Sequence, residues 1–258
     1  MADTRHVVLI HGTWLRGDSW ADTRAEFEQR GCTVHTPTLR FHELPLDEGA
    51  KKVGSVSLRD YADDFVALVE SLDSPPLILG HSLGGLIAQL VGARVQHAGL
   101  VAACTAPAAG IYAMYPSTAR IFGLHYLQGR PWNKPLCPAS WKVFRSYISN
   151  THSDAEAREI YAGLVCDSGR VYCEMGFPWL DRAKAATVDF AAITTPVHRC
   201  RRRPDGEYAG AAHDRDQVSA GHLRRDPAIR PPRLRGRIPT GDDEPHRRLD
   251  GTQSGVVR

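Results

Sequence analysis

The chain has 258 residues, of which 42% are hydrophobic and 24% charged, and its formal net charge is +3. This length suits one folded domain of about 200–250 residues with an insertion, and it excludes a mini-protein that depends on disulfides or a structural metal. The apolar runs at 6–10 and 75–80 are too short to span a bilayer, and the start of the chain is polar. We therefore expect a cytoplasmic protein without a membrane partner.

The cysteines give no sign of a metal site or a disulfide framework. None of the six lies in a closely spaced pair, so we predict free thiols, as in a reducing compartment. Histidine spacing also fits no zinc site, and we predict neither a metal nor a cofactor. The cysteines are Cys32, Cys104, Cys137, Cys166, Cys173 and Cys200.

The net charge differs between two parts of the chain. Residues 198–258 contain 14 Arg, no Lys and 9 acidic residues, a net +5, whereas residues 1–197 carry 18 basic and 20 acidic residues, a net −2. Val, Leu, Ile and Phe make up about 13% of the tail, below the roughly 20% at which charged segments are expected to stay disordered. We expect a folded enzyme over 1–197 and an atypical, disordered tail over 198–258.

The first third of the chain alternates apolar runs with an amphipathic helix. We predict strands at 6–12 and 32–39, separated by a helix over 18–31 that Asp18 or Ser19 caps and Gly31 ends. A second helix is expected at 57–72, where Ser57 and Asp60 have capping-box spacing.

The middle of the chain continues this alternation and then departs from it. Strands are predicted at 75–80 and 99–107, a helix at 83–94, and a further strand begins at 194–197, which together indicate a parallel sheet with helices on both faces. Between 110 and 193 helical pieces dominate, one of them with a capping box at Ser153 and Glu156. We divide the chain into a core (1–110), a helical insertion (111–190), the start of a core strand (191–197) and the tail (198–258).

One motif carries chemistry. Gly80, His81, Ser82, Leu83 and Gly84 form a G-x-S-x-G sequence between a predicted strand and a predicted helix. A sharp strand-to-helix turn exposes the serine hydroxyl, and it requires glycines because side chains would clash there. The pattern predicts a nucleophile elbow with Ser82 as the nucleophile, while the His81 side chain is expected to point away from Ser82.

The end of the first strand supplies a second element. Residues 11–14 read His-Gly-Thr-Trp, about 70 residues before the elbow. Backbone N–H groups at such a strand end and after the nucleophile bind the oxyanion of an acyl-transfer reaction. We predict an oxyanion hole made by the N–H groups of Thr13 and Leu83.

These segments, VVLIHGTW, LILGHSLGGLIAQ, ACTAPAAGI and ITTPV, resemble the α/β-hydrolase superfamily over about residues 5–197. The resemblance implies an α/β-hydrolase fold, a mostly parallel sheet with a helical cap formed by the insertion. It also implies a serine hydrolase that acts on a small carboxylic ester or similar carbonyl substrate through an acyl-enzyme. The motifs are shared by cofactor-free perhydrolases and lyase-like relatives. The aromatic residues of the insertion fit the core of the cap better than an acyl pocket.

The expected catalytic acid and base fall where the resemblance fails. The strand beginning at 194–197 runs into a cluster of arginines, which a buried strand accommodates poorly. Asp205 lies about where the superfamily has its acid, and His246 is our candidate base, with His213 and His222 as alternatives.

Three further readings remain. The tail fits a shifted reading frame, because arginine codons read one base later permit a Gly-Gly-Arg sequence. Loss of the histidine would instead leave a catalytically impaired hydrolase-like protein that binds at most a small molecule. A nucleic-acid-binding tail is disfavoured, since nine acidic residues are interleaved with the arginines.

Overall fold

A sheet in the order β2-β1-β3-β4-β7-β8 forms the centre of the structure. Its first five strands run parallel, and β8 pairs with β7 in the antiparallel direction. The strands are β1 (Arg5–Ile10), β2 (Cys32–His35), β3 (Leu77–His81), β4 (Gly99–Ala103), β7 (Val197–Arg202) and β8 (Tyr208–Gly210). The mostly parallel sheet predicted from the alternation of strands and helices is thus confirmed.

The computed structural model describes residues 5–111, 115–202 and 208–210, with backbone alone for 198–202 and 208–210. All of them belong to one unit, Met1–Asp226, and a second unit, Pro227–Arg258, lies outside the described residues.

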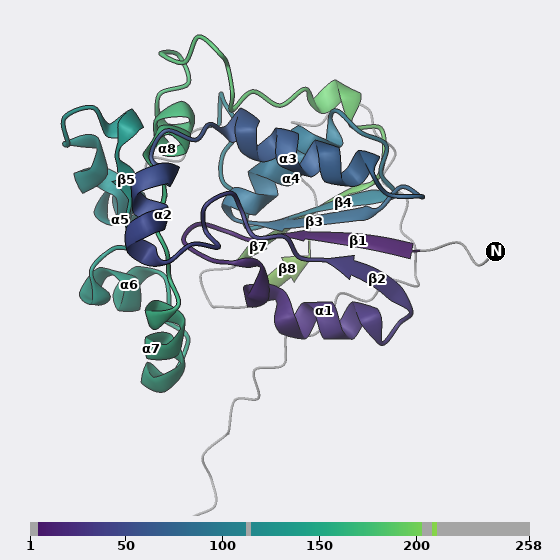
Figure 1. Ribbon diagram of the computed structural model, residues 1–258, viewed down its shortest axis with the longest axis horizontal. Helices are drawn as coiled ribbons and strands as arrows, with labels where there is room; N and C mark the ends of the chain where they lie inside the picture. The colour runs from purple at the N-terminus through teal and green to yellow at the C-terminus, as the bar shows by residue number, and fades with distance from the viewer. Residues whose placement is uncertain (1–4, 112–114, 203–207, 211–258) are drawn as a thin grey trace, which may run out of the picture. The chain divides into compact units, whose positions relative to one another are not determined.

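Helices cover both faces of the sheet (Figure 1). Helix α1 (Ala21–Glu28) lies on one face, and α3 (Leu58–Glu70) and α4 (Leu83–Gly92) lie on the other. Every residue of α4 is buried, which fits its nearly continuous apolar sequence. A short 3-10 turn (Gly17–Trp20) precedes α1, and α2 (Leu46–Val53), which the sequence analysis did not predict, follows β2.

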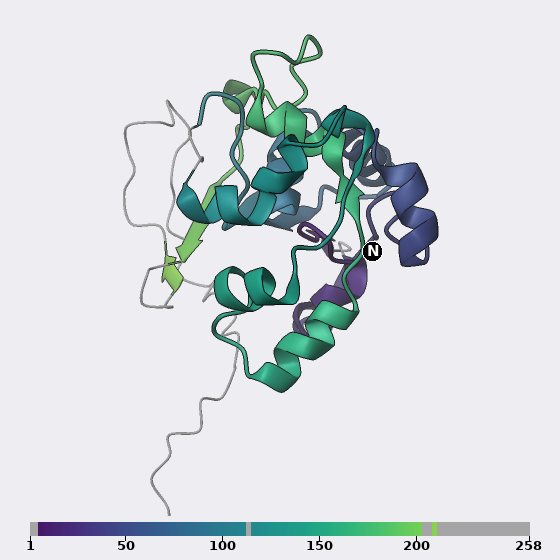
Figure 2. The same ribbon diagram turned by 90° about the vertical axis from the view of Figure 1, so that its left-hand side faces the viewer.

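The chain between β4 and β7 forms a helical cap beyond the carboxyl ends of the strands (Figures 1 and 2). Two short strands in this segment pair in the antiparallel direction and form a second sheet. The elements are α5 (Pro116–Tyr126), a 3-10 turn (Pro131–Asn133), β5 (Pro135–Leu136), α6 (Trp141–Tyr147), α7 (Asp154–Ala162), β6 (Asp167–Ser168), α8 (Gly169–Gly176) and a 3-10 turn (Phe190–Ala192).

A buried carboxylate joins the cap to the core. Glu174 of α8 accepts hydrogen bonds from the Ser57 hydroxyl (2.7 Å) and the Leu58 N–H (2.8 Å) at the start of α3. An anion at a helix N-terminus satisfies otherwise unpaired N–H groups and is favoured by the helix dipole. The capping box of Ser57 and Asp60 is present as predicted, and so is that of Ser153 with Glu156.

Two expectations about local structure are wrong. Helix α1 begins after Trp20, and neither Asp18 nor Ser19 caps it, because both lie within the preceding 3-10 turn. Cys137 and Cys166 form a disulfide, because the pairing of β5 with β6 brings residues 29 positions apart side by side. Cys32, Cys104 and Cys173 are free, as predicted.

The sheet also extends further along the chain than the charge pattern suggested. Strand β7 continues through the arginines to Arg202 and pairs with β4 from Val197 to Cys200, and β8 pairs with β7. A strand ladder uses backbone N–H and C=O groups, which every residue except proline supplies. A disordered tail starting at 198 is therefore wrong for residues 198–202 and 208–210.

The helices within residues 5–111, 115–202 and 208–210 are too short or too polar to span a bilayer.

The aromatic residues of the cap divide into buried and exposed members. Trp141, Phe144 and Tyr161 pack together, with ring centroids 5.1–6.2 Å apart, and Phe144 is 2% exposed. Trp132 and Trp179, in contrast, are 51% and 74% exposed. The core role predicted for most of the cap aromatics thus holds for Trp141 and Phe144 but not for these two tryptophans.

Candidate active site

Ser82 lies in a strained turn between β3 and α4. Its backbone has φ 54° and ψ −119°, a conformation that residues with a side chain rarely adopt. The Ser82 N–H donates to the Ala103 carbonyl of β4 (3.0 Å), and the Gly85 N–H donates to the Ser82 carbonyl (3.0 Å). The strand-to-helix turn predicted from the motif is therefore present, and we call residues 80–84 the serine turn.

The two glycines of the motif are needed because the backbone approaches itself closely. A Cβ atom on Gly80 would lie 2.0 Å from the Gly84 carbonyl oxygen. A Cβ atom on Gly84 would lie 2.2 Å from the carbonyl oxygen of Ile10 and 2.4 Å from that of His11. Real contacts of this kind are longer than 3 Å, so glycine at both positions allows α4 to start directly against the end of β1.

The loop after β4 supports the serine turn from the other side. The Ala106 N–H donates to the Ser82 carbonyl at 2.8 Å. Buried Gln89 of α4 donates to the Thr105 hydroxyl at 2.9 Å, and a Cβ atom on Gly85 would lie 2.9 Å from the Thr105 Cβ. These contacts were not foreseen from the sequence.

Residues 11–16, which follow β1 and which we call the β1 loop, reach the same place. A Cβ atom on Gly12 would lie 3.1 Å from the Ser82 Cβ and 3.2 Å from the His81 Nδ1. Within the described residues, the N–H groups of Thr13 and Leu83 donate no hydrogen bond. Two free backbone donors beside a serine are what an oxyanion hole requires.

His11 holds the start of the β1 loop. The side chain is fully buried, and its Nε2 accepts a hydrogen bond from the Leu39 N–H (2.9 Å), so Nδ1 carries the proton and donates to the Gly12 carbonyl (2.9 Å). Burial, together with the charge of His42, lowers the pKa of His11 to about 4. His11 is therefore neutral near pH 7 and serves as a structural support of this loop.

The β1 loop also contacts the cap. The hydroxyl groups of Thr13 and Tyr172 of α8 are hydrogen-bonded, although the two residues are 159 positions apart. Trp14 has φ 63°, and its indole N–H donates to the Leu136 carbonyl of β5 (2.9 Å). The cap is thus bonded to the loop that carries one predicted oxyanion donor.

The structure brings together part of the predicted site. Ser82, Leu83, Gly80 and Gly84 share the serine turn, and Thr13 lies in the adjoining β1 loop. The remaining candidates, Asp205 and His246 with the alternatives His213 and His222, lie outside the described residues.

His81 lies against the β1 loop, as its contact with the Gly12 position shows. Burial lowers its pKa, so the imidazole is neutral near pH 7. Among the described residues, no group of three His, Cys, Asp or Glu side chains could hold a metal ion.

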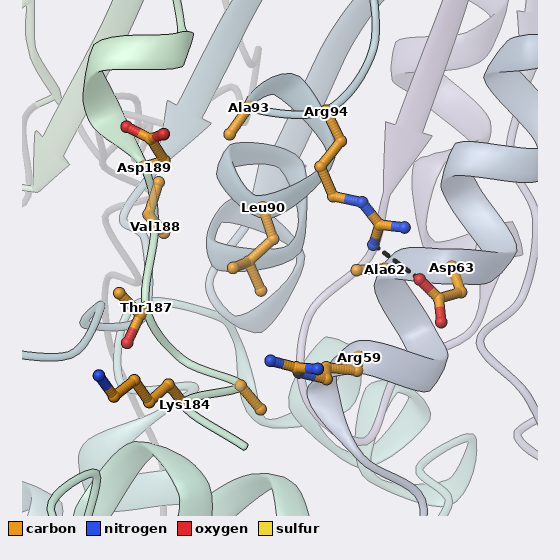
Figure 3. Close-up of a pocket in the computed structure, with 11 residues that line it drawn as sticks. Arg59, Ala62, Asp63, Leu90, Ala93, Arg94, Lys184, Thr187, Val188 and Asp189 are labelled. Carbon is orange, nitrogen blue, oxygen red and sulfur yellow. Dashed lines mark hydrogen bonds and ion pairs between the residues drawn. The ribbon is translucent and has the colours of Figure 1, made fainter. Parts of the chain in front are cut away.

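A separate hollow of about 440 Å³ lies between α3, α4 and residues 184–189 (Figure 3). Arg59, Arg94 and Lys184 line it together with Asp63 and Asp189. Arg94 already pairs with Asp63 at 2.7 Å. The hollow shares no lining residue with the serine turn or the β1 loop, so we do not assign the reaction to it.

Residues 7–247 match the model of the alpha/beta hydrolase family, and the chain belongs to this family. The resemblance noted in the sequence is confirmed. A curated relative, the pyrethroid hydrolase of Sphingobium wenxiniae, is 34% identical over 79 residues, which are 31% of this chain and 27% of that protein.

Solved structures show the same fold. An extracellular alpha/beta-hydrolase from a Paenibacillus species is 25% identical, with a TM-score of 0.52 over 63% of this chain and 66% of that one. That hydrolase is described as sharing structural and functional homology with a tobacco salicylic acid binding protein. A methylesterase from Arabidopsis has a TM-score of 0.54 at 14% identity, covering 76% and 77% of the two chains. The chain spans less than two thirds of the length of the first two relatives it matches.

Proposed function

We propose that this protein is an esterase-like serine hydrolase that cleaves a small carboxylic ester through an acyl-enzyme on Ser82. The observation that carries the proposal is the strained conformation of Ser82 beside two backbone N–H groups that have no partner within the described residues. A positive φ at a residue with a side chain costs about 1–3 kcal/mol and tends to be kept at functional sites.

The chemistry follows from this geometry. The Ser82 Oγ attacks the ester carbonyl carbon while a base removes its proton, and the N–H groups of Thr13 and Leu83 stabilise the oxyanion. Collapse of the tetrahedral intermediate releases the alcohol, which takes the proton back from the base. Water then repeats the sequence and releases the acid, with no need for a metal or a cofactor in our proposal.

We assign the base to His246 and the acid that orients it to Asp205. The assignment rests on their order after Ser82, which matches the serine, acid, histidine order of this family. Replacement of His246 by Ala should lower kcat at least about 10³-fold, whereas the same change at His213 or His222 should leave kcat unchanged. A loss of activity in the His222→Ala variant instead would transfer the role to that residue.

One relative supports a hydrolase that acts on a small molecule. It is named a pyrethroid hydrolase. A panel of p-nitrophenyl esters with acyl chains of increasing length would define the preferred acyl group, and we expect short chains to be favoured.

A fluorophosphonate probe with intact-mass detection tests the proposal most directly. The full chain should gain one adduct, the Ser82→Ala variant none, and the exposed control variant Ser71→Ala one. Absence of the adduct from soluble, folded protein would contradict the proposal and favour a catalytically impaired protein. The unlabelled mass also tests the frameshift hypothesis, since the printed sequence corresponds to 28.4 kDa.

We also retain the proposal of a cytoplasmic location, which the disulfide makes testable. Cytosolic thiols are kept reduced by glutathione and thioredoxin, so in a cytoplasmic protein Cys137 and Cys166 should be alkylatable inside the cell, and the disulfide should form once the protein is purified in air. If alkylation of freshly lysed cells under denaturing conditions leaves this pair blocked, the location is wrong.

A further inference from the structure

Three of the six residues of the β1 loop, His11, Leu15 and Arg16, are hydrogen-bonded to the neighbouring segment 36–45. The Leu39 N–H donates to His11, and the His42 Nδ1–H donates to the Leu15 carbonyl at 2.9 Å. Arg16 donates to the carbonyls of His42 (2.8 Å) and Leu44 (3.1 Å). The loop has no regular structure of its own, so these bonds fix its path.

The cap holds the same loop from the opposite side. The Trp14 indole donates to the Leu136 carbonyl, and the Val165 N–H donates to the Trp14 carbonyl at 2.9 Å. Each cap contact comes from the residue next to a half-cystine, so the Cys137–Cys166 disulfide joins the two segments that bind Trp14.

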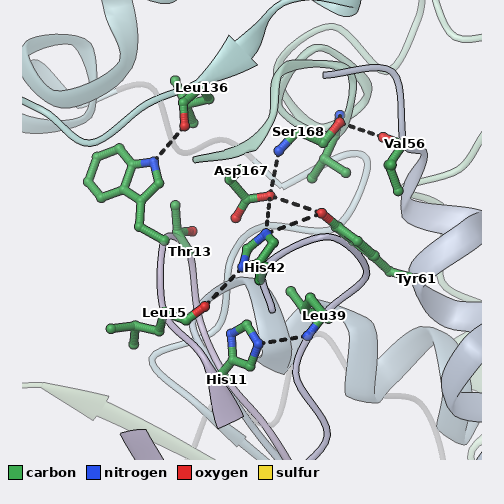
Figure 4. Close-up of polar contacts among 12 residues, drawn as sticks. His11, Thr13, Leu15, Leu39, His42, Val56, Tyr61, Leu136, Asp167 and Ser168 are labelled. Atoms are coloured by element: carbon green, nitrogen blue, oxygen red, sulfur yellow. Dashed lines mark hydrogen bonds and ion pairs between the residues drawn. The ribbon is translucent and has the colours of Figure 1, made fainter. Parts of the chain in front are cut away.

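A buried ion pair connects these two supports (Figure 4). His42 lies in segment 36–45 and Asp167 in β6 of the cap, both side chains are 0% exposed, and the His42 Nε2 lies 3.7 Å from the Asp167 Oδ1. The same oxygen accepts hydrogen bonds from the Ser168 N–H (2.6 Å) and the Tyr61 hydroxyl (3.4 Å). His42 therefore has the Leu15 carbonyl on one side and the cap carboxylate on the other.

Each member of this pair favours the charged form of the other. Burial alone would lower the pKa of His42, but the charge of Asp167, hydrogen bonding to Asp167 and the bond to the Leu15 carbonyl together outweigh it and raise that pKa. Burial would likewise raise the pKa of Asp167, but the charge of His42, hydrogen bonding to His42 and the bond from the Ser168 N–H together lower it. Both side chains are thus charged together in the weakly acidic range, whereas the neighbouring His11 stays neutral.

One feature of the pair is costly for stability. The second carboxylate oxygen, Asp167 Oδ2, is buried and has no hydrogen-bond partner within the described residues. Buried ion pairs often stabilise a fold no better than apolar residues of the same volume, and an unpaired buried oxygen weakens this one further. Stability alone is therefore a poor reason for an aspartate here, and a role in fixing one conformation explains it better.

We propose that Asp167 and His42 are a positioning pair, which fixes the β1 loop through the Leu15 carbonyl so that the Thr13 N–H faces the reacting carbonyl at Ser82. The inference deepens the proposed function and rests on it for the catalytic part. Neither residue touches the substrate. Their effect on the reaction passes through the loop.

Hydrogen exchange tests the structural part independently of any activity. In the Asp167→Asn variant of the full chain, a peptide spanning the β1 loop should exchange about tenfold faster than in the unchanged protein. The matched control is Glu174→Gln, which removes the charge of another buried cap carboxylate that contacts α3 instead of the β1 loop. In the control, faster exchange should be confined to the start of α3.

Kinetics test the catalytic part. Counting active sites with the fluorophosphonate probe gives kcat per working site, so a loss of folded protein does not lower the value. Asp167→Asn should lower this kcat about 10- to 100-fold, because small displacements of a catalytic group have effects of this size. KM should change less than about threefold, since ground-state contacts are retained. Asp167→Glu should recover part of the rate, and Glu174→Gln should keep the full rate.

The outcomes separate the two proposals. Suppose that the β1 loop exchanges faster in Asp167→Asn but the probe never labels the protein. This result upholds the positioning pair and overturns only the serine hydrolase assignment. Unchanged exchange together with an unchanged kcat per site overturns the pair and leaves the serine hydrolase assignment standing. If Asp167→Asn does not fold, Tyr61→Phe replaces it, because this change removes one hydrogen-bond donor to Asp167. The Tyr61→Phe variant should show faster exchange of the β1 loop and a lower kcat, both by smaller factors. If neither changes, the proposal of a positioning pair is overturned.

Discussion

The serine turn and the β1 loop meet at one edge of the sheet, but they are held in place in different ways. The serine turn is fixed by close backbone approaches within a few residues and by its neighbouring strands, and glycines permit these approaches. The β1 loop is fixed by side chains from distant parts of the chain, among them His42, Tyr172 and Asp167. One half of the candidate site is therefore local in the sequence, whereas the other half depends on how the cap packs.

This difference has a practical consequence for mutational studies. A change in the serine turn acts through steric overlap and should disturb folding and site together. A change in the supports of the β1 loop should instead leave the core folded and alter the loop alone. The four predictions below sharpen this contrast and are given from the largest expected effect to the smallest.

Gly84→Ala should be the most damaging change, because its new methyl group would lie 2.2 Å from the Ile10 carbonyl oxygen. Overpacking against rigid backbone is expected to lower the free energy of unfolding by about 3 kcal/mol or more. Denaturant midpoints of the variant and the unchanged protein would measure this loss of stability. The control is Gly123→Ala in α5, where nothing lies within 4 Å of the new methyl group and stability should rise slightly. Equal effects of the two changes would refute the close packing of the serine turn.

Removal of the Cys137–Cys166 disulfide should loosen the cap support of the β1 loop. For a separation of 29 residues, the loop-entropy model gives about 3.6 kcal/mol for the double change to serine. Thermal melting should show a lower Tm for this variant, while Cys32→Ser, which removes a free thiol, should melt within a few degrees of the unchanged protein. A melting temperature unaffected by the double change, or by reductant, would show that the pair is not joined.

Protonation of His11 should destabilise the protein in acid. Its pKa is lowered from 6.5 to about 4, so the unfolded chain binds a proton that the folded protein excludes between these values. The contribution of His11 to the free energy of unfolding is fully present above pH 6.5. It is lost as the pH falls towards 4, and the loss amounts to about 3 kcal/mol.

The pH dependence of Tm in the His11→Gln variant would measure this contribution. Glutamine can still accept the hydrogen bond from the Leu39 N–H, but it takes up no proton. The decline in Tm between pH 6.5 and 4 should therefore be shallower than in the unchanged protein. Parallel declines in both proteins would mean that His11 is not buried in its neutral form.

The smallest effect is expected at the surface. Arg94 and Asp63 form an ion pair in which both side chains are about half exposed. Such pairs contribute about 0.2–1 kcal/mol because solvent screens them. A double-mutant cycle with Arg94→Ala and Asp63→Ala should give a coupling energy in this range, and a larger value would indicate that the α3–α4 hollow is less exposed than its contacts imply.

The local half of the site was predictable from the sequence. The glycines around Ser82 and the strand before them specify the turn, and the capping boxes at Ser57 and Ser153 mark the starts of α3 and α7. In each case the responsible residues lie within a few positions of one another, so the pattern of residue types carries the geometry.

The other half was not predictable for physical reasons. No spacing rule pairs Cys137 with Cys166, because the pairing of β5 with β6 brings them together. Asp167 and His42 each look like ordinary polar residues until the cap packs on the core. The arginines of β7 suggested the end of the sheet, yet strand pairing depends on the backbone. The roles of Asp205 and His246 stay predictions.

The hydrogen bond between Thr13 and Tyr172 limits how this protein could be redesigned. Caps of related folds are attractive modules for chimeras, because they form one continuous insertion between two strands of the core. Here a transplanted cap would lose the partners of Thr13, Trp14 and His42 at once. A working chimera therefore needs residues 11–16 and 36–45 to be exchanged along with the cap, so the module that can be inherited or swapped as one piece is discontinuous in the sequence.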